Sequence, residues 1–306
     1  MKTIICLILS ISYSSYAAFD LEDLKTLITE SEKKDSDVLM VWKNGELLYS
    51  QNTNLEKKYS IQSVTKSLTA LTTTCILKDS PERIDDSHLF KEWEGTNKEA
   101  VTLRHLLSMN SGIVDPADPW GNDDYYHHAA NQPLITAPGT SFSYANVSTM
   151  IVGKWIKETT GEQFSSHINR CFFDALKIND WRIGKDGERN EVVAGGINML
   201  AQDLFKVGVM LIQNGTYEGQ ELFSPEQVKG LREDKLADKN GYGLGFWLWG
   251  KDIYYAEGYL GQFLIMVPKE NLVVLRMRNR DNMRGTENNK LNWFHELPGL
   301  VYNLIK

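Results

Sequence analysis

Strand-like patterns lie at both ends of this 306-residue chain, and helical patterns fill its middle. Near the N-terminus, apolar runs at residues 38–42 and 46–49 flank Lys43-Asn44-Gly45, whose Asn-Gly pair favours a tight hairpin turn. Four more strand patterns occupy residues 242–249, 253–256, 262–267 and 272–277. The terminal strands therefore predict an α/β (α+β) fold, with a mostly antiparallel sheet built from N- and C-terminal strands and flanked by helices.

Helical periodicity dominates the region between the two groups of strands. The predicted helices span residues 20–34, 63–77, 103–109, 144–159, 162–176, 199–213 and 289–305. The chain shows no internal repeat, and its 42% hydrophobic and 24% charged residues are typical of a globular protein with a sizeable core. We therefore expect a single domain over residues 19–306, with a helical subdomain inserted at roughly residues 63–190.

The first eighteen residues have the pattern of a secretory signal. Lys2 precedes an apolar run at residues 4–11, and small residues end the segment at Ala17-Ala18. A retained anchor or a buried first helix is the alternative, but the segment lacks the length or the amphipathic pattern that these need. We expect residues 1–18 to be a signal peptide, and the protein to be exported, periplasmic or secreted, without stable membrane insertion.

The charge balance is acidic, with a formal net charge of −7. Such a chain lacks the basic surface that binds phosphate backbones or anionic lipids, so nucleic acid is not an expected partner. The six histidines have no metal-ligand spacing, and no dinucleotide or phosphate-loop motif is evident. We therefore expect no metal and no cofactor. The oligomeric state is open.

Two cysteines remain once Cys6 is removed with the predicted signal. Cys75 lies on the apolar face of a predicted helix, and Cys171 lies in another. An oxidising compartment would permit a disulfide between them, but two buried thiols are an equally good interpretation.

A serine and a lysine share one face of the helix predicted at residues 63–77. In Ser63-Val64-Thr65-Lys66 the two polar side chains are three residues apart, so they point the same way. A serine hydroxyl becomes a nucleophile when a neighbour takes its proton, and a buried lysine with a lowered pKa can be that neighbour. Because serine is also a favoured helix cap, the motif alone is weak.

A second motif supports a catalytic interpretation of the Ser63 and Lys66 pair. The segment Pro138-Gly139-Thr140-Ser141-Phe142-Ser143-Tyr144-Ala145-Asn146 runs into the next long helix. Here the chain resembles the serine β-lactamase and penicillin-binding-protein superfamily, in particular the class C β-lactamase-like branch of esterases, amidases and D-peptidases. In that branch a Tyr-x-Asn motif follows a Ser-x-x-Lys helix. Residues 103–112 and Ala194-Gly195-Gly196-Ile197 also resemble segments of this branch, so the likeness covers nearly the whole chain after residue 18.

The resemblance implies a β-lactamase/transpeptidase-like fold and a covalent acyl transfer. Ser63 would be the nucleophile and Lys66 its partner, and Tyr144 would act as a general base or acid that moves the proton to and from the leaving group. Asn146 would orient Lys66 or bind a substrate amide. A phenol with an ordinary pKa near 10 would act near neutrality if cationic Lys66 stabilised its phenolate. Which of Lys66 and Tyr144 is the principal base is open.

The chain departs from the family at the third motif. Where the family commonly has Lys-Ser/Thr-Gly on the strand that lines the site, this sequence has Ala256-Glu257-Gly258. The missing lysine would hold a substrate carboxylate, and an ionised Glu257 would repel one, although its side chain could equally lie in solvent on the strand's outer face. Gly258 still allows close backbone approach, and the Tyr259 N–H would join the Ser63 N–H as an oxyanion hole.

These residues favour a serine hydrolase that acts on an ester or amide bond of a small-molecule or peptide-like substrate, with weak or no β-lactamase activity. One alternative is a β-lactamase or D-peptidase that acts on cell-wall-like substrates. Another is a binding protein that keeps the fold and has lost the chemistry.

Overall fold

A computed structural model describes residues 21–52, 54–120, 123–233, 241–279 and 294–306. The predicted signal at residues 1–18 lies outside the described residues. So does the first part of the helix predicted at residues 289–305, of which the structure describes α10 (Leu297–Asn303).

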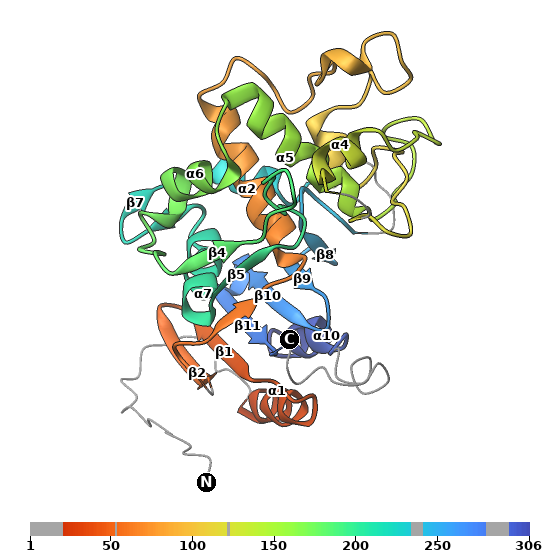
Figure 1. Cartoon of the computed structure of the whole chain (residues 1–306). Helices are drawn as coiled ribbons and strands as arrows, with labels where there is room; N and C mark the ends of the chain where they lie inside the picture. Colours follow the sequence, from red (N-terminus) through yellow and green to blue (C-terminus); the bar gives the residue numbers. More distant parts are fainter. Residues whose placement is uncertain (1–20, 53, 121–122, 234–240, 280–293) are drawn as a thin grey trace.

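A six-stranded sheet of order β2-β1-β11-β10-β9-β8 forms the centre of the fold, and every neighbouring pair is antiparallel (Figure 1). Its strands are β1 (Val38–Lys43), β2 (Glu46–Asn52), β8 (Trp247–Trp249), β9 (Ile253–Gly258), β10 (Gln262–Val267) and β11 (Leu272–Met277). The N-terminal strand β1 pairs along its whole length with the C-terminal strand β11, from Val38 opposite Met277 to Lys43 opposite Leu272. The predicted sheet of N- and C-terminal strands is therefore confirmed.

The predicted hairpin is also confirmed. Asn44 and Gly45 join β1 to β2 with positive φ angles of 52° and 94°. A two-residue turn with both central residues in the left-handed region matches the twist of the strands that it joins, and asparagine and glycine tolerate that region best.

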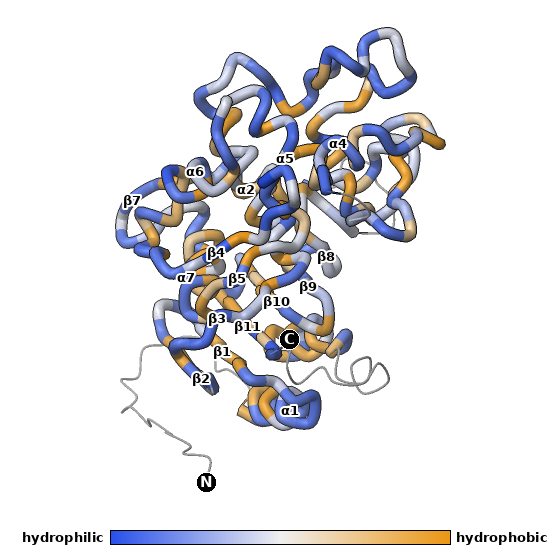
Figure 2. The backbone as a smooth tube through the Cα atoms, in the orientation of Figure 1, coloured by the Kyte–Doolittle hydropathy of each residue, from blue (hydrophilic) through white to orange (hydrophobic). Residues whose placement is uncertain are grey.

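Helices cover both faces of this sheet. In β1, Val38 and Met40 pack with α2 (Val64–Lys78) and α7 (Ala201–Ile212), while Leu39 and Val41 pack on the other side with α1 (Leu21–Lys33) and α10. Side chains alternate across a strand, so a strand buried on both faces is apolar throughout, as the continuous hydrophobic stretches of the sheet show (Figure 2). The helix that begins beside Ser63 is thus packed directly on the sheet.

The helices of the middle region gather beyond α2 (Figure 1). They are η1 (Lys91–Trp93), α3 (Leu103–Leu107), α4 (Tyr125–Ala130), α5 (Asn146–Thr160), α6 (Phe164–Ile168) and the π-helical η2 (Asn169–Phe173). The single helix predicted at residues 162–176 is therefore divided into α6 and η2. The proposed subdomain boundary at residues 63–190 stays a prediction.

Several short strands were not apparent in the sequence. They are β3 (Lys58–Ser60), β4 (Trp181–Ile183), β5 (Ile197–Leu200), β6 (Thr216–Tyr217) and β7 (Gln220–Glu221), and α8 (Pro225–Gly230) and η3 (Pro268–Glu270) complete the described elements. The helix predicted from Met199 begins instead at Ala201, because β5 pairs with both β3 and β4. The strand predicted at residues 242–249 is shortened to β8. Such pairings depend on partners remote in the sequence, which a local pattern does not reveal.

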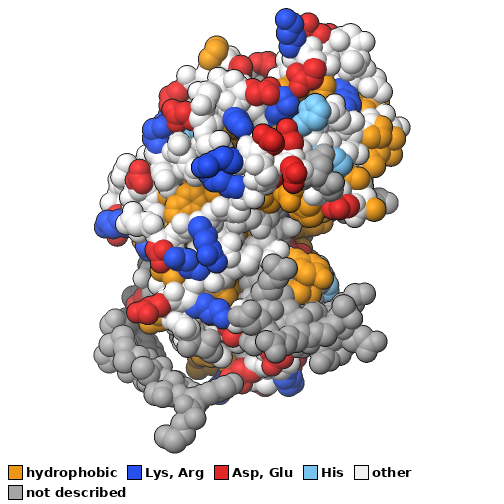
Figure 3. Space-filling view, in the orientation of Figure 1, with side chains coloured by type: hydrophobic (Ala, Val, Ile, Leu, Met, Phe, Trp, Pro, Cys, Tyr) orange, Lys and Arg blue, Asp and Glu red, His pale blue; other side chains and the backbone are white. Residues whose placement is uncertain are grey.

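Within the described ranges, no helix combines the length and the apolar character needed to span a bilayer. On the face shown in Figure 3, lysine and arginine side chains are interspersed with aspartate and glutamate.

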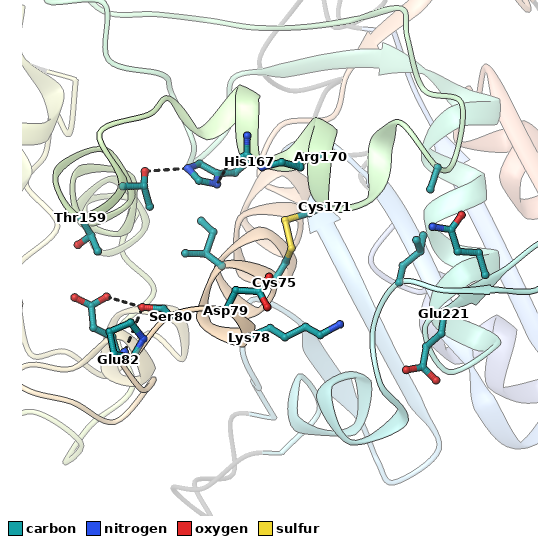
Figure 4. Close-up of a pocket in the computed structure, with 16 residues that line it drawn as sticks. Cys75, Lys78, Asp79, Ser80, Glu82, Thr159, His167, Arg170, Cys171 and Glu221 are labelled. Carbon is teal, nitrogen blue, oxygen red and sulfur yellow. Dashed lines mark hydrogen bonds between the residues drawn. A yellow bond between two sulfur atoms is a disulfide. The ribbon is translucent and has the colours of Figure 1, made fainter.

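A disulfide joins the far end of α2 to η2. Cys75 and Cys171 are bonded, with Cα atoms 6.1 Å apart, and they border a pocket of about 770 Å³ together with His167, Arg170 and Glu221 (Figure 4). Of the two alternatives that the sequence left open, a disulfide and two buried thiols, the structure has the disulfide. It closes a loop of 96 residues that contains α3, α4 and α5.

We predict that the double variant Cys75→Ala/Cys171→Ala loses about 3 kcal/mol of unfolding free energy, since a cross-link over a long loop restricts the unfolded chain. Urea denaturation followed by tryptophan fluorescence measures the difference. Wild-type protein unfolded under reducing conditions is the matched control and should lose a similar amount. A change below about 0.5 kcal/mol would contradict the prediction.

Candidate active site

Ser63 stands at the junction between the short strand β3 and helix α2. Gln62, directly before it, has a positive φ of 52°, and Ser63 itself has helical angles of −65° and −8°. Its hydroxyl makes no capping hydrogen bond to the helix backbone. Ser63 therefore occupies the N-cap position of α2 without capping the helix by its side chain, which instead contacts Lys66 Nζ.

Lys66 lies one turn further along α2 and is only 1% exposed. Its Nζ is 3.0 Å from Ser63 Oγ, 2.9 Å from Asn146 Oδ1 and 2.6 Å from the backbone oxygen of Ala194. These three oxygens come from the start of α2, from the first residue of α5 and from the loop before β5. The Nζ thus lies where three separate segments meet.

Burial lowers the pKa of Lys66 from its usual 10.5 to about 7, while the negative charge of Asp115 acts in the opposite direction. A neutral amine has two N–H donors and one lone pair. The Asn146 and Ala194 oxygens can accept the two donors, because a carbonyl oxygen cannot donate. The lone pair then remains for the proton of the Ser63 hydroxyl, which is the arrangement that a general base requires.

Tyr144 lies just before α5, on the other side of Ser63. Its phenol hydrogen-bonds to the Ser63 side chain, and its ring stacks on Trp247 at 5.6 Å between centroids, with 15° between the planes. Burial raises the pKa of Tyr144 to about 12, and the carboxylates of Glu257 and Asp115 also raise it. The expectation of a phenolate stabilised near neutrality is therefore wrong. The phenol keeps its proton at neutral pH and is suited to donate it.

Asn146 is oriented by Asp115, a residue that no sequence motif singled out. Asp115 Oδ2 accepts a hydrogen bond from Asn146 Nδ2 at 3.1 Å, and Asp115 Oδ1 accepts one from the Val147 N–H at 3.0 Å. The amide nitrogen of Asn146 is thereby fixed on Asp115, so its Oδ1 faces Lys66. Asp115 lies in the long loop after α3, and no sequence signal beyond a turn-forming Asp-Pro pair marks it.

The end of β9 passes beside the segment that leads into Ser63. A Cβ atom added to Gly258 would lie 2.4 Å from the Ile61 carbonyl oxygen and 3.1 Å from the Gln62 Cβ. Only glycine permits this approach. Within the described part of the chain, the Ser63 N–H makes no hydrogen bond. It lies at the N-terminal end of α2, where the helix dipole is positive.

The turn after Gly258 is held by a buried arginine. Arg276 on β11 donates from Nη1 to the carbonyl oxygen of Gly261 at 2.6 Å and from Nη2 to that of Lys34, at the end of α1, at 2.7 Å. Leu260 and Gly261 both have positive φ angles, 62° and 91°. The backbone that carries Tyr259 is thus fixed, while the Tyr259 side chain is 55% exposed.

Ala256 and Glu257 occupy the positions where the family resemblance expects a cation and a hydroxyl. Ala256 is buried against the α2 side of the sheet. The Glu257 side chain is only 17% exposed, which is not the fully solvated position considered from the sequence, and its Oε1 lies 3.7 Å from His295 Nδ1. The negative charge of Glu257 also raises the pKa of the Tyr144 phenol.

Four aromatic rings border the site. Tyr242 packs edge-on against both Tyr144 and Trp247, and Phe142 contacts Tyr242 and Trp247. No sequence pattern connects Trp247 or Tyr242 with the site, because they come from the C-terminal strand region and only the fold brings them to Tyr144.

No group of His, Cys, Asp and Glu side chains suited to a metal ion occurs among the described residues. The structure brings Ser63, Lys66, Tyr144 and Asn146 together and places Gly258 beside them.

Solved structures share this architecture. A putative beta-lactamase from Bacteroides dorei has a TM-score of 0.80 at 18% identity and covers 94% of this chain and 99% of its own. A putative 6-aminohexanoate-dimer hydrolase from Bacillus anthracis has a TM-score of 0.75 at 17% identity, covering 91% and 80%. The hydrolase EstCE1 has a TM-score of 0.70 at 13% identity, covering 93% and 97%. At these identities the likeness concerns the fold.

Curated relatives match a smaller part. "Protein flp" of Staphylococcus aureus is 26% identical over 137 residues, which are 40% of this chain and 27% of that protein, so the match spans about a quarter of the relative's length. The sequence profile of the Beta-lactamase family, in contrast, matches residues 24–296. With its β-lactamase/transpeptidase-like fold and a match over most of its length, the chain belongs to the Beta-lactamase family.

Proposed function

We propose that this protein is a serine hydrolase that cleaves ester or amide bonds through a covalent acyl-enzyme on Ser63. The observation that carries the proposal is the position of Lys66 Nζ, buried and 3.0 Å from Ser63 Oγ, with its two other contacts made to oxygens that can only accept. A lysine held in this way is a base directed at one hydroxyl.

In the acylation step, Ser63 Oγ attacks the substrate carbonyl carbon while neutral Lys66 takes the hydroxyl proton. The carbonyl π electrons move to the oxygen, and the Ser63 and Tyr259 N–H groups would stabilise the resulting oxyanion. When the intermediate collapses, the bond to the leaving group breaks and the Tyr144 phenol gives that group a proton. The Lys66 ammonium, with its Nζ 5.1 Å from the Tyr144 ring centroid, can then return a proton towards the phenolate.

Deacylation reverses these roles with water as the nucleophile. Neutral Lys66 takes a proton from the water as its oxygen attacks the acyl carbon, and Ser63 Oγ leaves with that proton from the Lys66 ammonium. The enzyme is regenerated and the acid product is released.

The residues at the end of β9 favour neutral substrates over substrates that carry a carboxylate. Ala256 provides no cation for a substrate carboxylate, and the charge of Glu257 opposes one. A neutral ester or amide therefore suits the site better than a penicillin, whose carboxylate lies near the reacting bond. EstCE1 is a hydrolase with promiscuous acyltransferase activity, which is consistent with such chemistry on this fold.

A binding protein that has lost the chemistry is a weaker proposal. The contacts of Lys66, the hydrogen bond between Tyr144 and Ser63 and the orientation of Asn146 by Asp115 are all present. A binding scaffold would have no need of a buried amine directed at a serine hydroxyl.

We further propose that the protein is exported after removal of residues 1–18. The disulfide between Cys75 and Cys171 supports this location, since such bonds persist in oxidising compartments.

We predict that Ser63→Ala lowers kcat/KM for 4-nitrophenyl acetate by about 10³-fold or more, on the order found when a serine nucleophile is removed. Labelling by a fluorophosphonate probe should disappear in parallel. Ser80→Ala, at the opposite end of α2, is the matched control and should keep both signals. Persistent labelling of Ser63→Ala would disprove the assignment.

The pH dependence tests the role of Lys66. Because the neutral amine is the base and its pKa is about 7, kcat/KM should rise with pH and level off above about 7. The phenol, with a pKa of about 12, should add no limb below about pH 9. In Asp115→Asn the rising limb should move to lower pH, since Asp115 raises the pKa of Lys66. A limb that moved to higher pH would contradict the assignment.

Turnover of the cephalosporin nitrocefin should be slow, with kcat/KM at least about 100-fold below that for 4-nitrophenyl acetate, because a carboxylate near the reacting bond meets Glu257 and no lysine. Absorbance assays on one enzyme preparation give both values. Nitrocefin turnover at the ester's rate would overturn this preference.

A further inference from the structure

The face of the sheet that carries Glu257 also carries two aromatic side chains. Trp247 on β8 pairs directly with Tyr255 on β9, so both rings project from the same face, and Glu257 follows two residues later on that face. Diagonal neighbours on adjacent strands have Cα atoms about 7–8 Å apart, which is within reach of long side chains. The carboxylate of Glu257 and the indole of Trp247 therefore share one small region.

This region is continuous with the reacting groups. The Trp247 indole stacks on Tyr144, and the Tyr144 phenol hydrogen-bonds to Ser63. Tyr144 is the proposed proton donor to the leaving group. A group attached to the leaving-group atom, a few bonds from the scissile carbonyl, therefore lies towards Trp247 and Glu257.

Two carboxylates, Glu257 and Asp115, act on the Tyr144 phenol, and Lys66 is the cation nearest to its ring among the described residues that the mechanism uses. Ala256 is buried where relatives place a lysine. The Glu257 side chain is mostly buried, and in such a position the local dielectric is low and the attraction of a carboxylate for a cation is strong. Its neighbour His295 carries a charge only when protonated and is 66% exposed at the rim.

We infer that the site selects esters or amides whose leaving group carries an ammonium, which the Glu257 carboxylate and the Trp247 indole would hold. The inference rests on the proposed acyl transfer at Ser63 and adds a substrate class to it. An ammonium gains from a carboxylate by charge and from an indole face by cation–π attraction, whereas a neutral group of the same shape gains from neither.

A matched pair of substrates tests the inference. Acetylthiocholine and 3,3-dimethylbutyl thioacetate differ only in a cationic nitrogen against a neutral carbon. We expect the wild-type enzyme to prefer the cationic thioester by about tenfold in kcat/KM. In Glu257→Gln the ratio of the two values should fall about five- to tenfold, whatever happens to the neutral thioester alone. Glu221→Gln, which removes the same charge from exposed strand β7, should leave the ratio unchanged.

Inhibition gives a second measurement that does not depend on turnover of either thioester. Choline and 3,3-dimethylbutanol should inhibit hydrolysis of 4-nitrophenyl acetate with inhibition constants that favour choline by about tenfold, and Glu257→Gln should remove this difference. Equal inhibition by both alcohols, or a thioester ratio near one, would overturn the inference. If the wild-type enzyme shows no preference for the cationic thioester, only the ammonium inference fails. Undiminished turnover by Ser63→Ala would refute the proposed function itself.

Discussion

The burial of one amine organises the site. Lys66 Nζ is removed from water and satisfied by three oxygens from three segments, namely Ser63 at the start of α2, Asn146 on α5 and Ala194 before β5. A buried lysine without such partners would destabilise the fold, so the segments must be held together by packing elsewhere. The sheet beneath α2, the disulfide at its far end and Asp115 behind Asn146 supply that support.

The same burial divides the chemistry between two groups. Removal from water opposes charge on either side chain, so it lowers the pKa of Lys66 and raises that of Tyr144. The lysine is left able to accept a proton and the tyrosine able to give one. Ser63 lies between them and is hydrogen-bonded to both. One physical cause would therefore produce an acid and a base beside the proposed nucleophile.

The sequence predicts the parts of this molecule whose determinants are local. The spacing of Ser63 and Lys66 on one helix, the Asn-Gly turn at Asn44 and the apolar terminal strands each depend on a few adjacent residues. Asp115 and Trp247 could not be found in this way, because their roles arise from contacts with Asn146 and Tyr144 that only the folded chain creates. For the same reason the end of β5 was mistaken for the start of a helix, since its pairing with β3 and β4 outweighs local helix preference. The pKa values of Lys66 and Tyr144 depend on burial, which a motif does not reveal.

The pairing of β1 with β11 also has a consequence for the timing of folding. The first strand of the sheet lacks its central neighbour until the last strand has been made, and Arg276, which fixes the turn beside Gly258, lies on that last strand and reaches back to the end of α1. Contacts between such distant positions form late and slowly. A chain that is still being synthesised from its N-terminus therefore cannot assemble the sheet that supports Ser63. The proposed active site would therefore be complete only after β11 has been synthesised and has paired with β1.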